Sequence, residues 1–285
     1  MFITVLMNGL YLSSIYCLVA LGLTLLLGVM DIADFAQGGL YMLGAFVTFF
    51  AAKIWGLNFL FAISLSIIAT TIVGVMNNIL VYQPVMRREA SSLIAALGIL
   101  LIIQNLALII FGADYQTFQL PFGQERIEIL RGTMTVYKSL IILTACVLVL
   151  AVWLFLHKTK IGKAIRAVSQ NREGAAIVGI GGGKVSIFTF GIGTALVGLS
   201  GALVSPLYAF DAYFGTNIIV KAFAISIFGG LGSILGTILG ALIIGIGENM
   251  FAAYLSTEYS DLTAFTLLIL ILFVRPQGLF GRKPA

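Results

Sequence analysis

Two carboxylic acids and an amide stand close together in an otherwise apolar part of the chain. Asp31, Asp34 and Gln37 all fall within the stretch Gly28–Gly39, GVMDIADFAQGG. An acid at the bilayer centre costs about 3 kcal/mol on insertion scales, so such residues line a polar pathway or lie near the membrane surface. Asp31 has a second role open to it, because its side chain can cap a helix that begins one or two residues later. Gln37 offers a donor and an acceptor to a passing polar solute.

A second unusual stretch is rich in glycine. Phe228–Gly240 reads FGGLGSILGTILG and interrupts an apolar run that is too long for one span. Its glycines recur every fourth residue at Gly232, Gly236 and Gly240, a spacing that lets membrane helices approach closely. Glycine that serves tight packing alone is the alternative interpretation for both stretches.

The two stretches have similar patterns, which suggests a weak internal repeat. Ala36–Phe50 corresponds to Phe228–Leu242, and both are glycine-rich at the start and helical afterwards. Broken helices at matching positions of two halves are a good sequence pointer to a substrate pathway. The candidate pathway residues are therefore Asp34, Gln37, Gly38, Gly230, Gly232 and Ser233.

One polar block stands between two long apolar runs. Residues Lys158–Ile180 read KTKIGKAIRAVSQNREGAAIVGI and contain a single acid, Glu173. The basic excess assigns the block to the cytoplasmic side of the membrane. Ile161, Ile165 and Val168 recur at helical spacing among polar residues, which predicts a short amphipathic helix that docks on a partner. An ordinary basic cytoplasmic loop is the alternative.

No arrangement of residues indicates catalysis or metal binding. The chain has one histidine, His157, and its two cysteines, Cys17 and Cys146, lie inside apolar runs. A G-x-S-x-G nucleophile motif is absent from the sequence. The run Gly179–Ser186, GIGGGKVS, lacks the first glycine of a phosphate-binding loop and has Val185 where a magnesium-binding Ser or Thr is needed. We therefore expect neither an enzyme nor a chain that hydrolyses ATP.

Composition defines the class of protein that must position these residues. Hydrophobic residues make up 60% of the chain and charged residues only 9%, with a mean hydropathy of +1.11. A soluble domain carries about 25% charged residues. Apolar runs long enough to cross the bilayer recur along the sequence, so this is a polytopic protein of the inner membrane. The net charge of +5 is explained by cytoplasmic Lys and Arg, and a nucleic-acid partner is not needed.

The apolar runs predict an all-α bundle of about eight transmembrane spans in a single domain, residues 1–285, with two broken or re-entrant segments. They fall near residues 3–28, 36–52, 58–82, 92–112, 138–156, 185–209, 218–251 and 262–274. All are interpreted as helices, because a lipid-exposed backbone must satisfy its own hydrogen bonds and no run alternates like a barrel strand.

Charge predicts the direction of the spans. The cytoplasmic positions are Arg87 and Arg88, the block Lys158–Lys184, and Arg275, Arg282 and Lys283. The loop Ala113–Tyr137 has no basic excess and is assigned to the outer side. This threading leaves the amino terminus outside and the carboxyl terminus inside, with Lys53 as a lone cation on the outer side.

The polar block also resembles a known family. Arg166-Ala167, Asn171, Ala175 and Gly179-Ile180 follow an R-A-x3-N-x3-A-x3-G-I spacing. This resembles the cytoplasmic coupling segment of ABC-importer permeases for branched-chain amino acids, the leucine/isoleucine/valine permease family.

Three more motifs of that family occur in order. The segment from Gly22 through Asp34-Phe35-Ala36-Gln37-Gly38 resembles its first signature, Phe228–Gly236 resembles its G-G-x-G-S-x-x-G signature, and the ending VRPQGLFG resembles its R-P-x-G-L-F/L-G tail. The resemblance covers nearly the whole chain. Asp34 replaces the more usual Asn and Gln37 stands where His is common, and the family also includes urea and short-chain amide permeases.

The resemblance implies a role and a set of partners. It implies one of two related permease subunits, served by two cytoplasmic ATPases and a periplasmic binding protein, with no cofactor on this chain because the partner subunits bind ATP. The residues it assigns to ATPase coupling are Gly162, Arg166, Ala167, Asn171, Glu173, Ala175 and Gly179, within the coupling segment 158–180. Arg166, Asn171 and Glu173 are expected to be its polar anchors.

The alternative is an ion-coupled secondary transporter or channel for small polar solutes. In that case Asp31 or Asp34 binds an ion or a proton. Broken helices and internal repeats occur in such proteins too. The polar block Lys158–Ile180 distinguishes the two interpretations, because a secondary transporter needs no helix that docks on an ATPase.

Overall fold

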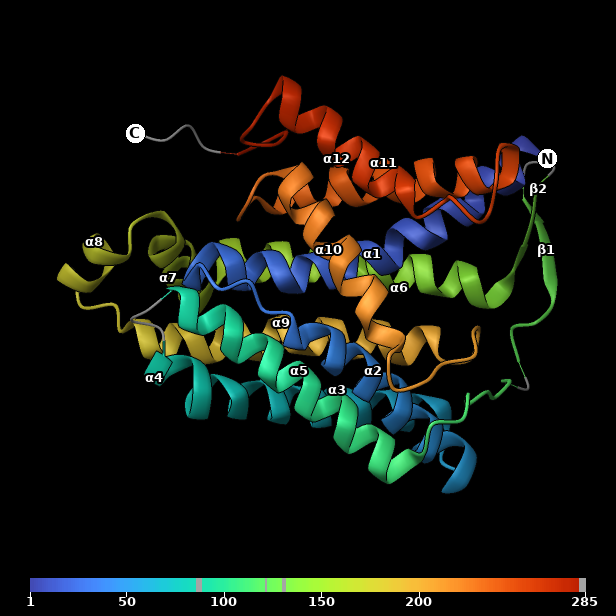
Figure 1. Cartoon of the computed structure of the whole chain (residues 1–285), viewed down its shortest axis with the longest axis horizontal. Coiled ribbons are helices and arrows are strands. Elements are labelled where there is room, and N and C mark those ends of the chain that lie inside the picture. Colours follow the sequence, from blue (N-terminus) through green and yellow to red (C-terminus); the bar gives the residue numbers. More distant parts are fainter. Residues whose placement is uncertain (86–88, 121, 130–131, 282–285) are drawn as a thin grey trace. The chain divides into compact units, whose positions relative to one another are not determined.

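The computed structural model describes residues 1–85, 89–120, 122–129 and 132–281, and nearly all of its regular structure is helical (Figure 1). The α-helices and π-helices (η) are α1 (Phe2–Met30), α2 (Ala36–Phe49), η1 (Phe50–Ile54), α3 (Phe59–Asn77), η2 (Asn78–Tyr82), α4 (Gln83–Val85), α5 (Glu89–Phe111), α6 (Val136–Lys158), α7 (Lys160–Gln170), α8 (Arg172–Ile177), α9 (Gly182–Val204), α10 (Phe214–Gly229), α11 (Ile234–Tyr254) and α12 (Leu262–Val274). The predicted polytopic helical architecture is therefore confirmed.

The number of spans differs from the prediction. Within the described part of the chain, six helices are long and apolar enough to cross a membrane, and α10 and α12 are shorter apolar helices. The count of eight is thus not confirmed. The run near residues 218–251 is two helices, because the chain turns at residues 230–233, where Gly230 and Gly232 have positive φ angles of 103° and 76°.

A small β-hairpin occurs where only a loop was expected. Strands β1 (Arg126–Ile129) and β2 (Gly132–Thr135) pair antiparallel, with Ile127 opposite Met134. Four-residue strands are too short for alternation to distinguish them from a loop in the sequence. Five basic residues that were used in the charge-based prediction of span direction, or that belong to its loops, lie outside the described residues: Arg87, Arg88, Arg131, Arg282 and Lys283.

The chain divides into two units, which are described separately. Unit 1 comprises Met1–Thr24, Leu120–Leu150 and Val220–Ala285, and unit 2 comprises Leu25–Gln119 and Ala151–Ile219.

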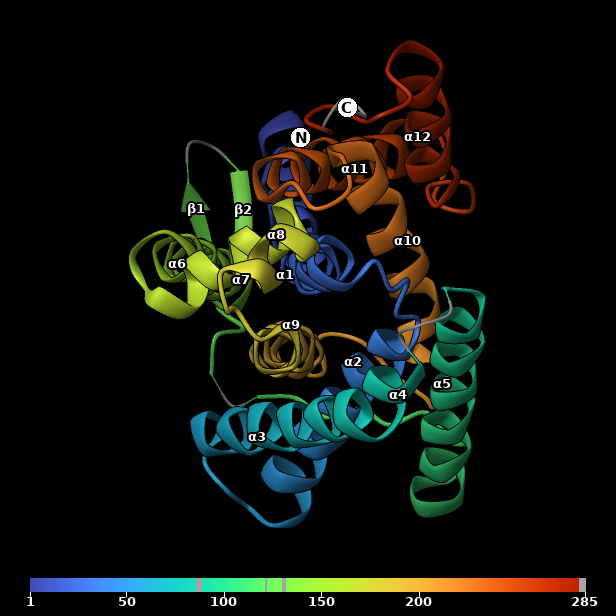
Figure 2. The same ribbon diagram turned by 90° about the vertical axis from the view of Figure 1, so that its left-hand side faces the viewer.

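Unit 2 is built on a seam of small residues between α2, α3 and α9, which lie side by side (Figures 1 and 2). A Cβ atom added to Gly44 would lie 2.3 Å from the carbonyl oxygen of Gly198, and one added to Gly198 would lie 2.0 Å from Thr70 Oγ1. Only hydrogen fits at these positions. Small residues allow membrane helices to pack by close backbone contact, so the seam fixes the helices that carry the polar residues of unit 2.

Unit 1 contains a second close contact, between α10 and α11. A Cβ atom on Gly236 would lie 1.9 Å from the carbonyl oxygen of Gly229. A carboxyl-terminal strap, residues 278–281, covers the end of α10: Leu279 N–H donates to the Phe228 carbonyl at 2.9 Å and Phe280 N–H to the Gly229 carbonyl at 3.0 Å. The strap thus satisfies carbonyl groups that the end of a helix leaves without intrahelical partners.

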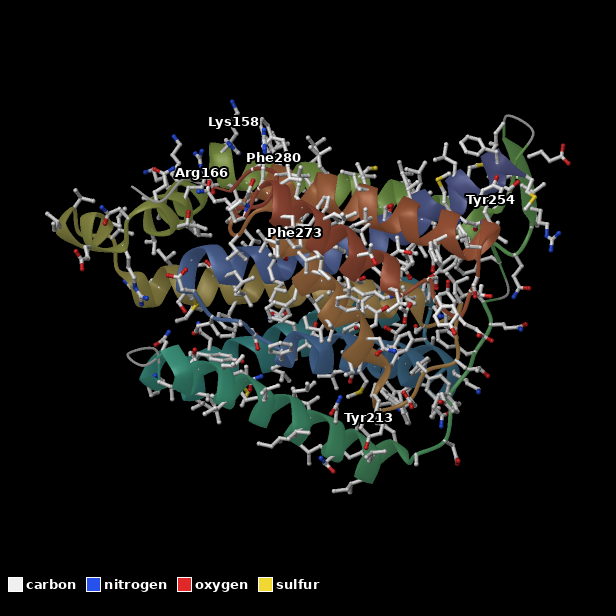
Figure 3. All side chains as sticks on the ribbon, turned by 45° about the horizontal axis from the view of Figure 1, so that its top comes forward. Lys158, Arg166, Tyr213, Tyr254, Phe273 and Phe280 are labelled. Carbon is white, nitrogen blue, oxygen red and sulfur yellow. The ribbon has the colours of Figure 1, made fainter. Side chains whose placement is uncertain are left out.

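Large apolar side chains are exposed along the helices of both units. Ile109 of α5 and Phe273 of α12 are 80% and 86% exposed, and Figure 3 shows Phe273 projecting from its helix. Such exposure is costly in water and favourable in lipid, as expected for membrane-embedded helices.

Candidate functional site

The first candidate segment is the non-helical connection between α1 and α2. Asp31 ends α1 in the left-handed region with φ 53°, and its N–H donates to the Leu27 carbonyl at 3.1 Å. The capping role that the sequence left open to Asp31 is therefore wrong, because α2 begins only at Ala36, with Phe35 at its N-cap position. Asp34 lies next to that start, and its Oδ1 accepts the Ala36 N–H at 3.0 Å.

Asp34 is the centre of a buried polar cluster. Its Oδ1 accepts a short hydrogen bond from the Tyr82 hydroxyl, and its Oδ2 accepts one from Gln37 Nε2 at 2.9 Å. Asp34 is 1% exposed, while Gln37 and Tyr82 are fully buried. No ion pair of Asp34 occurs among the residues that the structure describes, so its partners there are neutral donors.

A second layer of polar groups lies one helical turn away. Asn78 and Tyr82 are the first and last residues of η2, a π-helical segment of the kind that is frequent at functional sites. Ser186 Oγ on α9 donates to Asn78 Oδ1 at 2.8 Å, and the Phe190 ring, one turn further along α9, packs on the Tyr82 ring with centroids 5.2 Å apart.

Two polar atoms of this region have no hydrogen-bond partner in the described structure. They are Gln37 Oε1, an acceptor, and Asn78 Nδ2, a donor, and both are buried. Buried polar groups are hydrogen-bonded in more than nine cases of ten, so an orphaned acceptor and an orphaned donor in one region require an explanation.

The sequence interpretation found only part of this cluster. It named Asp34 and Gln37 as candidate pathway residues, and Asn78, Tyr82 and Ser186 were not among those candidates. A signal was present, because Asn78 and Tyr82 are four residues apart in an apolar run and share one helix face. Their partners on α9 are about one hundred residues away, and only the fold brings them together.

Gly38 serves close packing. A Cβ atom there would lie 2.7 Å from the Gly215 carbonyl oxygen, and one on Gly215 would lie 1.7 Å from that of Gly38. The start of α2 is therefore held against the start of α10, which fixes the backbone next to Gln37.

The second candidate segment, between α10 and α11, is arranged differently. Ser233 caps α11 by accepting the Gly236 N–H at 3.2 Å. Gly230 is buried, and a Cβ atom there would lie 2.4 Å from the Gly281 nitrogen of the strap, whereas Gly232 is exposed. These candidates belong to unit 1, while Asp34, Gln37 and Gly38 belong to unit 2.

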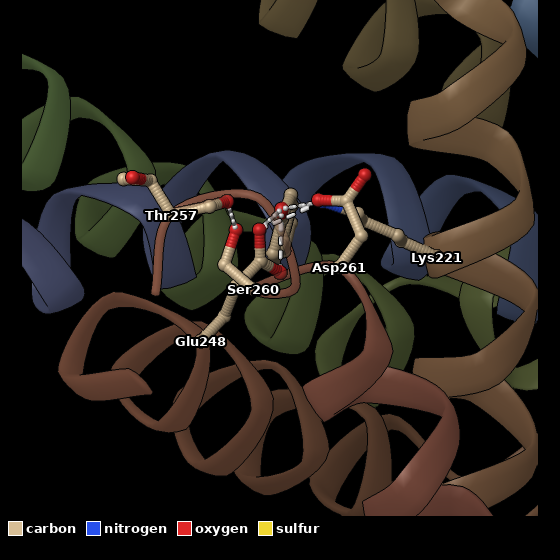
Figure 4. Close-up of polar contacts among 6 residues, drawn as sticks. Lys221, Glu248, Thr257, Ser260 and Asp261 are labelled. Carbon is tan, nitrogen blue, oxygen red and sulfur yellow. Dashed lines mark hydrogen bonds and ion pairs between the residues drawn. The ribbon is translucent and has the colours of Figure 1, made fainter. Parts of the chain in front are cut away.

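Unit 1 holds an ionic cluster that was not predicted, in which Lys221, Glu248 and Tyr16 are buried and Asp261 is exposed (Figure 4). Lys221 Nζ on α10 lies 2.7 Å from Glu248 Oε1 on α11 and 2.8 Å from Asp261 Oδ1 before α12. Tyr16 on α1 contributes its hydroxyl, which accepts from Lys221 at 2.9 Å and donates to Glu248 at 2.9 Å. Every proton of the ammonium group thus has an acceptor, and the cluster ties four elements of this unit together.

The polar block folds as two short helices. The predicted amphipathic helix is α7, in which Ile165 and Val168 are buried. Thr159 caps it by accepting the Gly162 N–H at 2.9 Å, and Gly162 packs against the preceding turn, where a Cβ atom would lie 2.2 Å from the Phe155 carbonyl oxygen. Figure 3 shows Lys158 and Arg166 at the corner between α6 and α7.

The family-like spacing of the block is explained by the capping of α8. Asn171 Oδ1 accepts the Gly174 N–H at 2.7 Å at its start. At its end Gly179 has φ 84°, its N–H donates to the Ala176 carbonyl, and the Ile180 N–H donates to the Ala175 carbonyl at 3.0 Å. This pair of bonds is a Schellman motif. The motif residues therefore shape the helix.

Capping leaves other residues of α8 free for contact. Ile177 and Val178 are 86% and 74% exposed at its end, and Glu173 is exposed in its first turn. In the described part of the chain, no group of three or more His, Cys, Asp or Glu side chains could hold a metal ion.

Taken together, apolar helices long enough to cross a membrane, a broken helix, a buried polar cluster and an amphipathic element are the features of a multi-pass membrane transport protein.

The family follows from comparison with known proteins. The profile of the family described as "Branched-chain amino acid transport system / permease component" matches residues 5–272, so this chain belongs to that family. The chain is 33% identical to the high-affinity branched-chain amino acid transport system permease protein LivH of Escherichia coli, over 99% of this chain and 96% of LivH.

Two further similarities are more distant. The permease protein LivM of Escherichia coli is 25% identical over 94% of this chain and 68% of LivM. Among solved structures, "PsaBC from Streptococcus pneumoniae in complex with Fab" superposes with a TM-score of 0.55 at 11% identity, covering 95% of this chain and 91% of that one. At that identity the likeness supports the fold alone.

Proposed function

We propose that this chain is a transmembrane permease subunit of an ATP-binding cassette importer. In this role it forms, as a single permease domain of residues 1–285, part of the pathway by which branched-chain or related amino acids cross the inner membrane. The proposal rests on family membership and on one structural observation, the preformed helical element α7–α8.

That element has the properties of a docking segment. Its two helices are capped by their own residues, Thr159 and Asn171, and α8 ends in exposed Ile177 and Val178. Exposed apolar residues beside charged ones suit a groove on a cytoplasmic protein better than they suit water. We propose that the groove belongs to an ATPase and that its closure on ATP moves α7–α8 as a lever.

The coupling residues divide into two groups under this proposal. Gly162, Asn171, Ala175 and Gly179 hold the shape of the element through caps and close packing. Arg166 and Glu173, beside Ala167, supply the polar contacts to the ATPase, and Ile177 and Val178 the apolar ones.

The partners proposed are a second related permease subunit, two cytoplasmic ATPases that bind the ATP, and a periplasmic substrate-binding protein. LivH and LivM are both named as permease proteins of a high-affinity transport system, and this chain is similar to both, which supports a pair of related permeases. The amino terminus is proposed to face the periplasm and α7–α8 the cytoplasm.

The proposed pathway residues are Asp34, Gln37, Gly38, Gly230, Gly232 and Ser233. Asp34 and Gln37 are supported by their burial in an apolar environment, where polar groups are retained at a cost. Gly38 and Gly230 act through close packing that fixes the two breaks, so bulk at either obstructs the movement of the segment.

Reconstitution tests the function directly. The complete transporter in proteoliposomes should accumulate L-leucine only with ATP, both ATPases and the binding protein. Omission of the ATPases should abolish accumulation even when a proton or sodium gradient is imposed. Accumulation driven by such a gradient without ATPases would establish the secondary-transporter alternative instead.

A further inference from the structure

The Asp34 carboxyl group is surrounded by donors but not by a cation. It accepts hydrogen bonds from the Tyr82 hydroxyl, the Gln37 amide and the Ala36 N–H, and no Lys or Arg of the described structure pairs with it. Taking a carboxylate out of water is expensive, and neutral donors offset only part of the cost. A positively charged group would complete this environment.

Gln37 adds a second acceptor on the same side. Its Nε2 must face Asp34, because an amide oxygen there would be repelled by the carboxylate, so its orphaned Oε1 is fixed as an acceptor. A carboxylate and a free amide oxygen together are complementary to a cation with several N–H donors, such as a primary ammonium group.

Asn78 presents the opposite chemistry. Its Oδ1 is occupied by the Ser186 hydroxyl, which fixes its buried Nδ2 as a donor without an acceptor. Asn78 and Tyr82 are the two ends of the single π-helical turn η2, so the donor at Asn78 and the acceptors around Tyr82 are separated by about one helical turn. A solute with adjacent ammonium and carboxylate groups can then accept a hydrogen bond of about 2.9 Å from Asn78 and donate hydrogen bonds of that length to Asp34 and Gln37.

We propose that this cluster is a recognition point for the zwitterionic main-chain part of an amino acid, with Asp34 and Gln37 binding the ammonium group and Asn78 the carboxylate. The proposal rests on the proposed function and deepens it. Asp34 becomes a specificity-determining residue, because a neutral amide or urea can donate hydrogen bonds to the carboxylate but cannot neutralise its charge.

Access to the cluster requires movement of the connection between α1 and α2, since all of these side chains are buried. That connection is non-helical and includes the positive φ angle of Asp31. The cluster lies beside the small-residue seam, and the close packing of α2, α3 and α9 there holds its side chains in place.

Three related ligands separate the two ends of the site. L-Leucine carries both charged groups, 4-methylpentanoate lacks the ammonium group, and 3-methylbutylamine lacks the carboxylate. The complete transporter without its binding protein is titrated with each, in the resting and the vanadate-trapped state, and the shift of the thermal unfolding midpoint reports the apparent affinity.

The expected pattern is reciprocal. Asp34→Asn should weaken the amine and leucine about tenfold or more and leave the acid unchanged, because a hydrogen bond to a charged group is lost. Asn78→Leu, or the smaller change Asn78→Ser if Leu impairs folding, should weaken the acid and leucine and leave the amine unchanged. Asn105→Ala, which removes an exposed amide on α5, is the control and should change nothing.

The result that overturns the proposal is equally specific. It fails if no ligand shifts the wild-type midpoint in either state, or if Asp34→Asn and Asn78→Ser affect the acid and the amine alike. Failure of this inference and failure of the proposed function differ, because the wild-type transporter still accumulates leucine with ATP in the first case and does not in the second.

Discussion

Two buried acids in this molecule have almost the same burial but different surroundings. Glu248 in unit 1 is 6% exposed and Asp34 in unit 2 is 1% exposed, and each accepts a hydrogen bond from a tyrosine hydroxyl. Glu248 also has Lys221 at 2.7 Å, whereas Asp34 has only neutral donors among the described residues. An acid that is paired with a cation needs no ligand to balance its charge, whereas an acid with only neutral donors has no such balance.

The difference teaches how to separate a structural ionic cluster from a functional one. In the Lys221 cluster every ammonium proton has an acceptor, so Lys221 has no free donor left for a solute. In the Asp34 cluster the neighbouring Gln37 and Asn78 each retain a buried orphaned atom. The exposed fraction of the acid, taken by itself, would not distinguish the two clusters.

Breaking the neutralised cluster should have the largest effect on stability. Lys221→Met removes the only cation within reach of Glu248 in the described structure and leaves a buried charge, which costs about 3–5 kcal/mol. Thermal unfolding of the purified permease complex in detergent measures the loss. The double variant Lys221→Met/Glu248→Leu should be more stable than Lys221→Met, and the opposite order would show that the pair matters for other reasons.

Removing one hydroxyl from each cluster sharpens the comparison. Tyr82→Phe should cost about 1.5–3 kcal/mol, because Asp34 loses one of its few donors, while Tyr16→Phe should cost about 1 kcal/mol, because Lys221 remains on Glu248. The two unfolding midpoints are compared under identical conditions. Equal losses would mean that the cation does not protect Glu248.

Neutralising Asp34 should change stability less than Tyr82→Phe does. Asp34→Asn keeps a side chain of the same shape and removes a charge that lacks a cation, so the free energy of unfolding should change by no more than about 1 kcal/mol. ATP-dependent uptake of leucine should nevertheless fall sharply. A large destabilisation would place Asp34 with Glu248 as a structural acid.

The charges of α7–α8 provide the lower limit of the series. Glu173 is exposed and Arg166 is half-buried, and neither forms an ion pair in the described structure, so substituting both by Ala should shift stability by only about 0.5 kcal/mol. Uptake should fall because hydrolysis by the ATPase is no longer coupled to it, as a paired assay of ATP turnover and leucine uptake would detect. Unchanged uptake in this double variant would argue against the docking role of α7–α8.

The sequence was sufficient to predict the features that depend on neighbours along the chain. Apolar runs predicted the long helices, glycine spacing located the interruption near Gly230, and Ile165 and Val168 predicted the buried face of α7. Each of these follows from local composition or period, which the fold does not alter.

Features that depend on distant partners were missed or misassigned. Lys221 lies inside an apolar run, and nothing nearby in sequence indicates that Glu248 and Asp261 neutralise it. The capping role considered for Asp31 was wrong because the sequence does not show where the next helix begins, and only the backbone conformation reveals that the chain leaves α1 at Asp31 and becomes helical again at Ala36. Tyr82 could not be singled out, since an aromatic residue at a helix end is ordinary in a membrane protein.

The strap of residues 278–281 has a consequence for how the protein is made. The carbonyl groups of Phe228 and Gly229 are synthesised well before the N–H groups of Leu279 and Phe280 that satisfy them. At typical translation rates of about 5–20 residues per second, the partners emerge about 50 residues and several seconds later. During that interval the end of α10 must be satisfied by water or by the insertion machinery. Unit 1 is therefore completed late in biosynthesis, and a ribosome stalled before residue 278 should leave a nascent chain that is unusually open to proteolysis near Gly230.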